Sequence, residues 1–375
     1  MGVELNINAD MITWAIARAG HDLQEFLATN PRIEDWISQK RKPTLRQLEK
    51  FSHKVHLPFG YLFLKDPPKE SLPIPFFRTS SEESQDVSLN VYDTILLMQR
   101  RQEWLREYLK DNDVSQLSFV GKYSQHSSPD EVVRDMRKVL NLEGLWARQL
   151  PTWEKAIDYL VTRIEEAGVI VVFNSVVENN TSRGIGVDDC RGFVLVDDYC
   201  PFMFVNSADA KAAQMFTIVH ELAHVWTGQS AGFDFRQLQP ADQKIEHLCD
   251  RIAAELLVPA EIFITEWNKK PSFDILARNF KVSPIVIARR ALDLGVISRD
   301  DFFQFYNEYI KLFKEKKEAQ SGGGDFYATA KKRVSLTFAS HVNRAVHSNK
   351  LLYRDANKLL GLKGDTYEKF INKHF

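Results

Sequence analysis

The chain has 375 residues, of which 44% are hydrophobic and 26% are charged, and this composition excludes a disordered or fibrous protein and predicts two or three domains. The formal net charge of -1 gives the chain as a whole no attraction toward nucleic acid or membranes. Three scattered cysteines exclude a disulfide framework and a CxxC metal site.

The sequence also predicts a compartment. Its first residues show no basic start followed by an apolar run, because acidic residues interrupt them. No stretch approaches the roughly 18 apolar residues that a membrane span needs. Together with the few cysteines, these features predict a cytoplasmic protein without a membrane partner.

Residues 1–66 are expected to form a small helical domain. Apolar residues recur there near helical spacing, and Thr44 is placed to cap a helix. Residues 67–128 are expected to be a linker and a helical connector. The Pro-rich stretch at 67–75 breaks all periodicity, and the pattern at 87–112 is helical.

Residues 129–310 combine helices with a few strands. The helical pattern at 129–168 ends at a glycine. Apolar runs that are rich in Val and Phe follow at 169–173, 192–196 and 202–206, and they predict strands. The rest of the region is helical in pattern. The predicted fold class is therefore α+β, with a mainly helical domain that carries a small β-sheet.

Residues 311–375 are expected to form a basic helical region. They contain fourteen Lys/Arg and six Asp/Glu, a balance of +8, so the residues before them must carry -9. A Gly-rich segment at 321–325 is expected to be a flexible joint. The charge favours an acidic partner, either nucleic acid or protein, but a solvated helical face explains it equally well.

The strongest chemical signal is FTIVHELAHVW at 216–226, which contains His220, Glu221 and His224 in the order HExxH. Residues four apart lie on the same face of a helix, so both imidazoles can reach one Zn²⁺ ion. Glu221, beside the first ligand, is placed to take a proton from water activated at the metal. The apolar flanks predict a buried helix, inside which such polar groups need partners.

A catalytic zinc site needs a third protein ligand and one open position. The helical segment at 244–259 offers Glu246, which lies 22 residues beyond His224. This separation leaves room for a loop at 227–241 and a returning helix. Three other residues of the segment remain alternatives: His247, Asp250 and Glu255.

These motifs resemble the ImmA/IrrE family of zinc metallopeptidases. The resemblance rests on FTIVHELAHVW, on EHLCDRIAAELLVP at 246–259 and on RGFVLVDDYCPFMFVN at 191–206, which is similar to the strand pair before the zinc helix of that family. It implies that Glu246 is the third ligand. The chain departs from the family pattern at Cys249, where a small residue is usual, and at Asp250, where asparagine is common. We interpret Cys249 as a small buried thiol, because a fourth ligand would close the site.

The N-terminal segment resembles the helix-turn-helix of Xre-type regulators. Residues 23–27 and 32–38 would be its two helices. The side chains expected to contact phosphates are Lys40, Arg41, Lys42 and Arg46. Because Pro31, Glu34 and Asp35 lie where the second helix would meet DNA, a domain that has lost DNA binding or grips a protein is an equal alternative.

The family resemblance implies regulatory proteolysis of one specific protein, which would be a repressor, an antitoxin or a toxin encoded nearby. Zn²⁺ would be the cofactor and Glu221 the general base. An edge of the sheet at 192–196 or 202–206 would align an extended substrate.

The alternative hypothesis is an antitoxin or transcriptional regulator that binds a toxin and operator DNA and whose zinc site is not catalytic. Glu221 favours the enzyme, because a purely structural site would not need it. A homodimer is compatible with the sequence under either hypothesis.

Overall fold

The computed structural model describes residues 4–68, 76–77, 88–229, 231–233, 244–317, 332–362 and 366–375. The chain divides into two compact units. The first comprises Met1–Pro73 with Gln85–Asp93, and the second comprises Ile74–Ser84 with Thr94–Phe375. The boundary falls within the long helix α5 (Leu89–Lys110), which confirms the helix predicted at 87–112.

Three segments with predicted loop or linker structure fall wholly or mainly outside the described residues: 67–75, 227–241 and 321–325. Among the helices that are described, none is both long enough and apolar enough to cross a membrane.

The first unit is helical. Its helices are α1 (Ala9–Arg18), α2 (Leu23–Thr29), α3 (Pro31–Ile37), α4 (Leu45–Lys54) and the 3-10 helix η1 (Phe59–Phe63). Thr44 caps α4 as predicted, and the Gln47 side-chain oxygen accepts a hydrogen bond from the Thr44 backbone N–H at 2.8 Å. Phe26, Trp36 and Phe51 lie in the buried core, where the Trp36 and Phe51 rings meet edge-on with centroids 6.2 Å apart.

The second unit contains a five-stranded sheet in the order β1-β7-β5-β6-β2 and a separate two-stranded sheet of β3 and β4. The strands are β1 (Phe76–Phe77), β2 (Ile170–Asn174), β3 (Val176–Val177), β4 (Asn180–Gly184), β5 (Gly192–Leu195), β6 (Phe202–Asn206) and β7 (Ala231–Phe233). The three predicted strands are confirmed as β2, β5 and β6. Strands β1, β3 and β7 have only two or three residues, and β4, with five, is polar, so no apolar run predicted β4.

Strands β5 and β6 are interior strands of the larger sheet. β5 is antiparallel to both β7 and β6, and β6 is also paired in parallel with β2. The prediction that 192–196 or 202–206 offers a free edge to an extended substrate is therefore wrong, because each strand already has a partner on both sides. The outer strands of the described sheet are β1 and β2.

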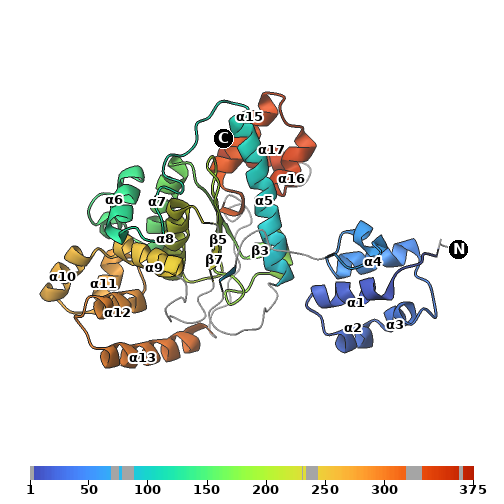
Figure 1. Cartoon of the computed structure of the whole chain (residues 1–375), viewed down its shortest axis with the longest axis horizontal. Coiled ribbons are helices and arrows are strands. Elements are labelled where there is room, and N and C mark those ends of the chain that lie inside the picture. The colour runs from blue at the N-terminus through green and yellow to red at the C-terminus, as the bar shows by residue number, and fades with distance from the viewer. Residues whose placement is uncertain are drawn as a thin grey trace. The chain divides into compact units, whose positions relative to one another are not determined.

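Helices lie on both sides of this sheet (Figure 1), with α7, α8 and α9 on one side and the second-unit part of α5 with α15, α16 and α17 on the other. Besides α5, the helices of this unit are α6 (Pro129–Val139), η2 (Trp146–Gln149), α7 (Trp153–Glu166), α8 (Lys211–Thr227), α9 (Lys244–Leu257), α10 (Ala260–Lys269), α11 (Phe273–Phe280), α12 (Pro284–Asp293), α13 (Arg299–Lys317), α15 (Leu336–His347), α16 (Tyr353–Leu360) and α17 (Thr366–His374). The predicted α+β class, mainly helical with a small sheet, is confirmed.

The main core of the second unit lies between the sheet and α8. Val194 of β5 and Met203 of β6 belong to the same buried cluster as Ile218 and Leu222 of α8. Because these strands are buried on both faces, they read as continuous apolar runs without alternation. The sheet thereby fixes the position of α8, the helix that carries the HExxH motif.

Candidate metal centre

Helix α8 is buried on all sides over its second half. Every residue from Thr217 to Thr227 is buried, as the apolar flanks of the motif predict. The helix ends at Gly228, whose φ of +73° is left-handed, and a Cβ there would lie 2.9 Å from the Gly121 Cα. Gly228 therefore meets two requirements. It adopts the left-handed turn that ends the helix, and it leaves room for the backbone of Gly121.

Helix α9 packs alongside α8 and presents a buried acidic residue to the interior. Ile245, Leu248 and Ile252 form its buried apolar stripe. Glu246, in the first turn, is only 2% exposed. A carboxylate at such a position needs partners, and α8 supplies them.

His220 and His224 of α8 and Glu246 of α9 converge on one point. The Nε2 atom of His220 lies 3.1 Å from Glu246 Oε2 and 3.2 Å from His224 Nε2. The Nε2 atom of His224 lies 3.2 Å from Glu246 Oε1. One ligand atom from each side chain lies within 4.8 Å of the other two. The structure therefore brings together the three residues that the sequence suggested as metal ligands.

The pKa values in this cluster reflect a balance between burial and pairing. Burial lowers the pKa of His224. Burial acts in the same direction on His220, but hydrogen bonds with Asp250 and Glu246 outweigh it and raise the pKa of His220 to about 10. Burial alone would raise the pKa of Glu246, yet the two imidazoles hold it well below its usual range. The carboxylates of Glu246 and Asp250 thus favour a positive charge on His220, whereas burial and the neighbouring His220 disfavour one on His224.

The side chains present fit a divalent cation. The two Nε2 atoms lie 3.2 Å apart and each lies within 3.2 Å of a Glu246 oxygen, so the three side chains can offer ligand atoms to one ion. A cation between them would satisfy both nitrogens and the carboxylate together. Two imidazoles and one carboxylate are the protein ligands of one common class of catalytic zinc site, whereas calcium and magnesium prefer oxygen ligands.

Glu221 is a buried carboxylate beside this cluster. Both of its side-chain oxygens are buried and lack a hydrogen-bond partner. Burial raises the pKa of Glu221 to about 8. Leaving such a group unpaired lowers folding stability, so packing does not explain its presence. An unsatisfied carboxylate next to a candidate metal centre is instead a typical general base.

Asp250 has a different position from the one that ligand spacing suggested. Its Oδ1 atom lies 3.0 Å from His220 Nδ1, the ring nitrogen that does not face the cluster. A carboxylate there fixes the orientation of the imidazole and directs Nε2 toward His224 and Glu246. The sequence signal was the four-residue spacing from Glu246, which places both carboxylates on one face of α9.

The other candidate ligands lie outside the cluster. His247 is exposed, and Glu255 forms an ion pair with Arg290. Cys249 is buried, which confirms the interpretation as a small buried thiol, and burial raises the pKa of this thiol.

Gly192 of β5 is a contributor to the centre that no sequence motif indicated. A Cβ atom at this position would lie 2.5 Å from Thr217 Cγ2 and 3.5 Å from Glu221 Cγ. The absence of a side chain therefore lets the strand lie against α8 where the Glu221 side chain begins. Only the pairing of strand and helix in the folded chain reveals this contact.

The residues expected to contact DNA belong to the first unit. Lys40, Arg41 and Lys42 follow α3, Arg46 lies in α4, and all four are exposed. Arg41 forms a weak ion pair with Asp35 at 3.8 Å. The helices α2 and α3 cover the two predicted segments and are separated by a single residue, Asn30. Binding of DNA by these side chains stays a prediction.

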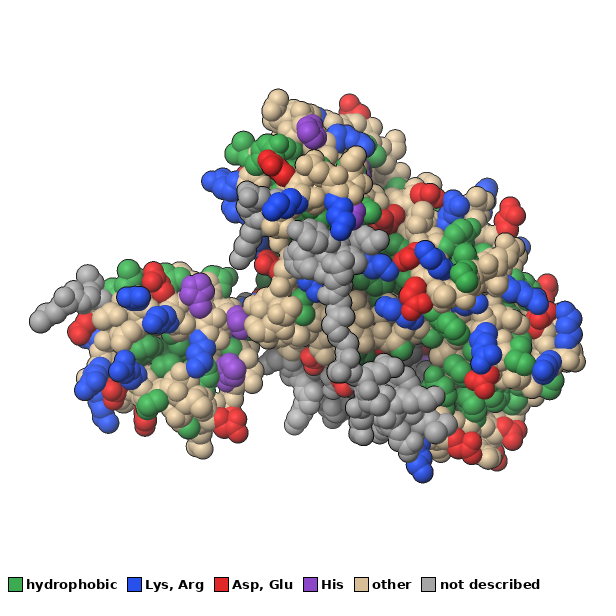
Figure 2. Space-filling model, turned by 180° about the vertical axis from the view of Figure 1, so that it is seen from behind, with side chains coloured by type: hydrophobic (Ala, Val, Ile, Leu, Met, Phe, Trp, Pro, Cys, Tyr) green, Lys and Arg blue, Asp and Glu red, His purple; other side chains and the backbone are tan. Residues whose placement is uncertain are grey.

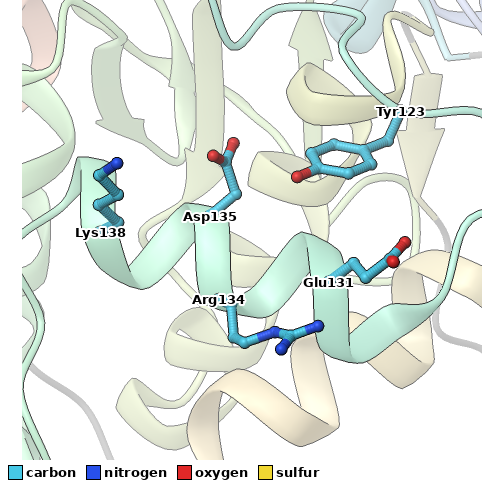
Figure 3. A pocket seen from close by; sticks show the side chains of 5 residues that line it. All are labelled: Tyr123, Glu131, Arg134, Asp135 and Lys138. Atoms are coloured by element: carbon cyan, nitrogen blue, oxygen red, sulfur yellow. The ribbon is translucent and has the colours of Figure 1, made fainter.

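A pocket of about 440 Å³ lies on α6, away from the cluster, and is lined by Tyr123, Glu131, Arg134, Asp135 and Lys138. Figure 3 shows Arg134 on the other side of α6 from Asp135 and Lys138. Asp135 is already engaged, because it accepts hydrogen bonds from Lys122 at 2.6 Å and from the Trp226 indole at 3.0 Å. Through the bond between Asp135 and Trp226 this side of α6 contacts the last turn of α8, and the pocket contains none of the candidate ligands.

Comparisons with known proteins agree with the resemblance seen in the motifs. Residues 164–292 match the family of the IrrE N-terminal-like domain, Peptidase_M78, and this range contains every residue of the cluster. The match supports the ImmA/IrrE resemblance and indicates a peptidase domain. Residues 334–373, which span α15 to α17, match a domain of unknown function, DUF8813. No curated protein matches the chain.

Proposed function

We propose that the chain is a zinc-dependent regulatory endopeptidase that cleaves a specific protein partner. The observation that carries the proposal is the buried and unpartnered carboxylate of Glu221 beside the cluster of His220, His224 and Glu246. A structural zinc site needs only its ligands. An additional buried acid would destabilise such a site without contributing to it.

The roles of the side chains follow from their positions. His220, His224 and Glu246 would hold zinc, which supplies a Lewis acid that polarises the substrate carbonyl and acidifies water. Glu221 takes the proton of the attacking water on a carboxylate oxygen and later delivers it to the leaving amine. Asp250 keeps the His220 ring in the orientation that points Nε2 into the centre.

The substrate that we propose is one regulatory protein encoded nearby, either a repressor, an antitoxin or a toxin. This choice rests on the family resemblance, which implies limited proteolysis of a partner in the cytoplasm. A specific partner also fits the burial of the centre, because a site enclosed by helices favours a substrate that is delivered in one defined pose.

The test is Glu221→Gln, which keeps the size of the side chain and removes the base. Wild type and variant are incubated with the purified product of the adjacent gene, and cleavage is followed on a gel while zinc is measured in both proteins. We expect zinc to be retained and the cleavage rate to fall by about 10² to 10⁴, the usual contribution of a general base. Glu261→Gln, an exposed glutamate on α10, is the matched control. A Glu221→Gln protein that contains zinc and cuts at the wild-type rate would refute the role of Glu221.

A second candidate function is a regulator that binds a toxin and operator DNA around a non-catalytic zinc site. The exposed cations Lys40, Lys42 and Arg46 of the first unit favour it. In that case wild type leaves the partner uncut, and the Glu221→Gln protein binds the partner with unchanged affinity.

A further inference from the structure

The first unit contains a pocket that neither the proposed peptidase chemistry nor the expected phosphate contacts use. The pocket has a volume of about 380 Å³, and its lining comes from the end of α2, from α3 and from α4. Three of the lining residues are Lys or Arg, and none of those that the structure describes is Asp or Glu. The pocket is therefore both concave and cationic. Apolar side chains beside cations are also visible on the face of this unit at the left of Figure 2.

The floor of the pocket is apolar. Ile33 and Trp36 of α3 and Phe51 of α4 line it, and all three belong to the buried core of the first unit. Ile33 and Trp36 are three residues apart, so they present one face of α3 to the pocket. Covering the part of this floor that remains in contact with water is favourable for an apolar side chain of a ligand.

Cations reach the pocket from both helices. Arg32 comes from α3, whereas Lys50 and Lys54 lie four residues apart on one face of α4. Lys54 donates to the Asn30 side chain at 2.7 Å and lies over the Phe26 ring. Arg32 and Lys50 are exposed, and neither has an ion-pair or hydrogen-bond partner among the described residues. An anion placed beside these cations would offset the repulsion between them.

The uncharged amide side chains of the lining are already engaged. Asn30 accepts from Lys54 and donates to the Phe26 carbonyl at 2.8 Å, and the Gln47 oxygen accepts from the Thr44 N–H. A small-molecule site usually holds its ligand with a few fixed polar groups. This pocket offers an apolar floor and cations on long exposed stems instead, which suits a protein segment better than a small molecule.

The shape of the pocket favours a protein over duplex DNA. Helices that bind DNA protrude into a groove of the duplex, where they contact phosphates and the edges of bases. A phosphate backbone has no apolar group with which to fill a hollow, and bringing a charged phosphate against an apolar floor is costly. An acidic peptide supplies both an apolar side chain for the floor and carboxylates for the cations.

We propose that this pocket is a docking site for an acidic segment of a partner protein. One large apolar side chain of that segment lies on the floor that Ile33, Trp36 and Phe51 form, and carboxylates beside it pair with Arg32 and Lys50. The ion pairs are exposed, so the apolar contact contributes the larger share of the affinity and the carboxylates select an acidic segment. This binding function is independent of the metal centre and of the peptidase chemistry.

The experiment measures binding of the full chain to three fluorescein-labelled twelve-residue peptides by anisotropy. The first peptide consists of glutamate and alanine around one central phenylalanine. The second has serine in place of the phenylalanine, and the third has glutamine in place of every glutamate. We expect the first to bind and the second to bind more weakly by roughly tenfold or more. The third should bind more weakly by roughly threefold to tenfold near 0.1 M salt, and higher salt should reduce this difference.

The protein variant is Arg32→Ala with Lys50→Ala, which removes one cation from each helix and leaves the floor intact. We expect it to bind the first peptide more weakly by roughly threefold to tenfold and the glutamine peptide as wild type does. Arg32→Lys with Lys50→Arg keeps the charge and should retain binding. The matched control, Lys269→Ala with Lys270→Ala at the end of α10, removes the same charge and should bind as wild type does. A shared melting temperature shows that all variants fold.

Three results would overturn the proposal: the phenylalanine peptide gives no saturable change in anisotropy, the alanine pair binds it as tightly as wild type does, or the α10 pair weakens binding as much. The proposal also fails if the alanine pair loses affinity for a 30-base-pair DNA duplex and not for the peptide, because the cations of the pocket would then contact phosphates. Cleavage is not measured, so failure of the proposed peptidase function would leave this result unchanged.

Discussion

At the candidate metal centre the ionisable groups are buried on α8 and α9, whereas on α17 and after α3 the charged groups are exposed. The buried groups are strongly coupled, because His220 alone contacts a second histidine and two carboxylates within 3.2 Å. The exposed groups act through water and counterions. Single substitutions should therefore have large effects at the centre, whereas cations at the surface should act together and depend on salt.

The largest effect is expected from removing a ligand. Glu246→Ala leaves two buried imidazoles without their carboxylate, so zinc affinity should fall by more than the roughly 10- to 100-fold that is typical for loss of a partner outside the ligand shell. Metal analysis after dialysis against a weak chelator measures this, and His220→Ala should behave alike. Glu261→Ala on α10 is the control. Full occupancy in Glu246→Ala would exclude Glu246 as the third ligand.

A smaller effect is expected from Asp250→Asn, which weakens the hold on His220 Nδ1 without touching the cluster. We expect zinc affinity to fall by about 10- to 100-fold. Competition with a chromogenic chelator provides the measurement. Asp293→Asn, an exposed aspartate paired with Arg289, serves as the comparison. Equal affinities in the two variants would show that Asp250 has no orienting role.

Gly192→Ala tests the packing behind Glu221. The added Cβ would meet Thr217 Cγ2 at 2.5 Å, so strand and helix must separate, and the free energy of unfolding should fall by about 1 to 3 kcal/mol. Gly184→Ala on β4 is the matched control, since a Cβ there meets nothing within 4 Å. Denaturant unfolding compares the two, and equal midpoints would contradict the close approach.

Glu165 is partly buried, so it lies between the buried metal centre and the exposed cations, and it makes the stability of the fold depend on pH. Burial raises its pKa although Ser335 and Thr337 donate hydrogen bonds to it. The folded chain therefore keeps this proton at pH values where the unfolded chain has lost it, and stability should decrease as pH rises through that window, by at most about 1.4 kcal/mol per pH unit. Above the pKa that Glu165 has in the folded chain, this group no longer makes the free energy of unfolding change with pH. Glu165→Gln should flatten the dependence, whereas Glu166→Gln, its exposed neighbour, should not.

The smallest effect is expected for Lys40, Arg41 and Lys42 replaced together by alanine. Because Glu34 and Asp35 lie beside them, we expect duplex affinity to fall only roughly twofold, through screened long-range attraction. The anisotropy of a fluorescent 30-base-pair DNA duplex, measured near 0.1 M salt, reports this affinity. A loss of about tenfold or more would contradict this expectation and show that these cations contact phosphates directly.

The sequence alone predicted the parts of this protein that depend on local pattern. The strands β2, β5 and β6 are continuous apolar runs, and α8 is an apolar helix in which His220 and His224 are four residues apart, so chain periodicity is sufficient to find them. The Thr44 cap is likewise a local interaction. Glu246 was one choice among several by spacing, and the family resemblance selected it.

Other features depended on contacts between distant segments, which no local pattern encodes. The interior positions of β5 and β6 arise from pairing with β7 and β2, so the expected free edge disappeared only when the sheet was assembled. The orienting contact of Asp250, the space at Gly192 and the burial of both Glu221 oxygens all require α8 to lie against α9 and β5. Sequence spacing places residues on a helical face, but only tertiary packing decides which neighbour that face meets.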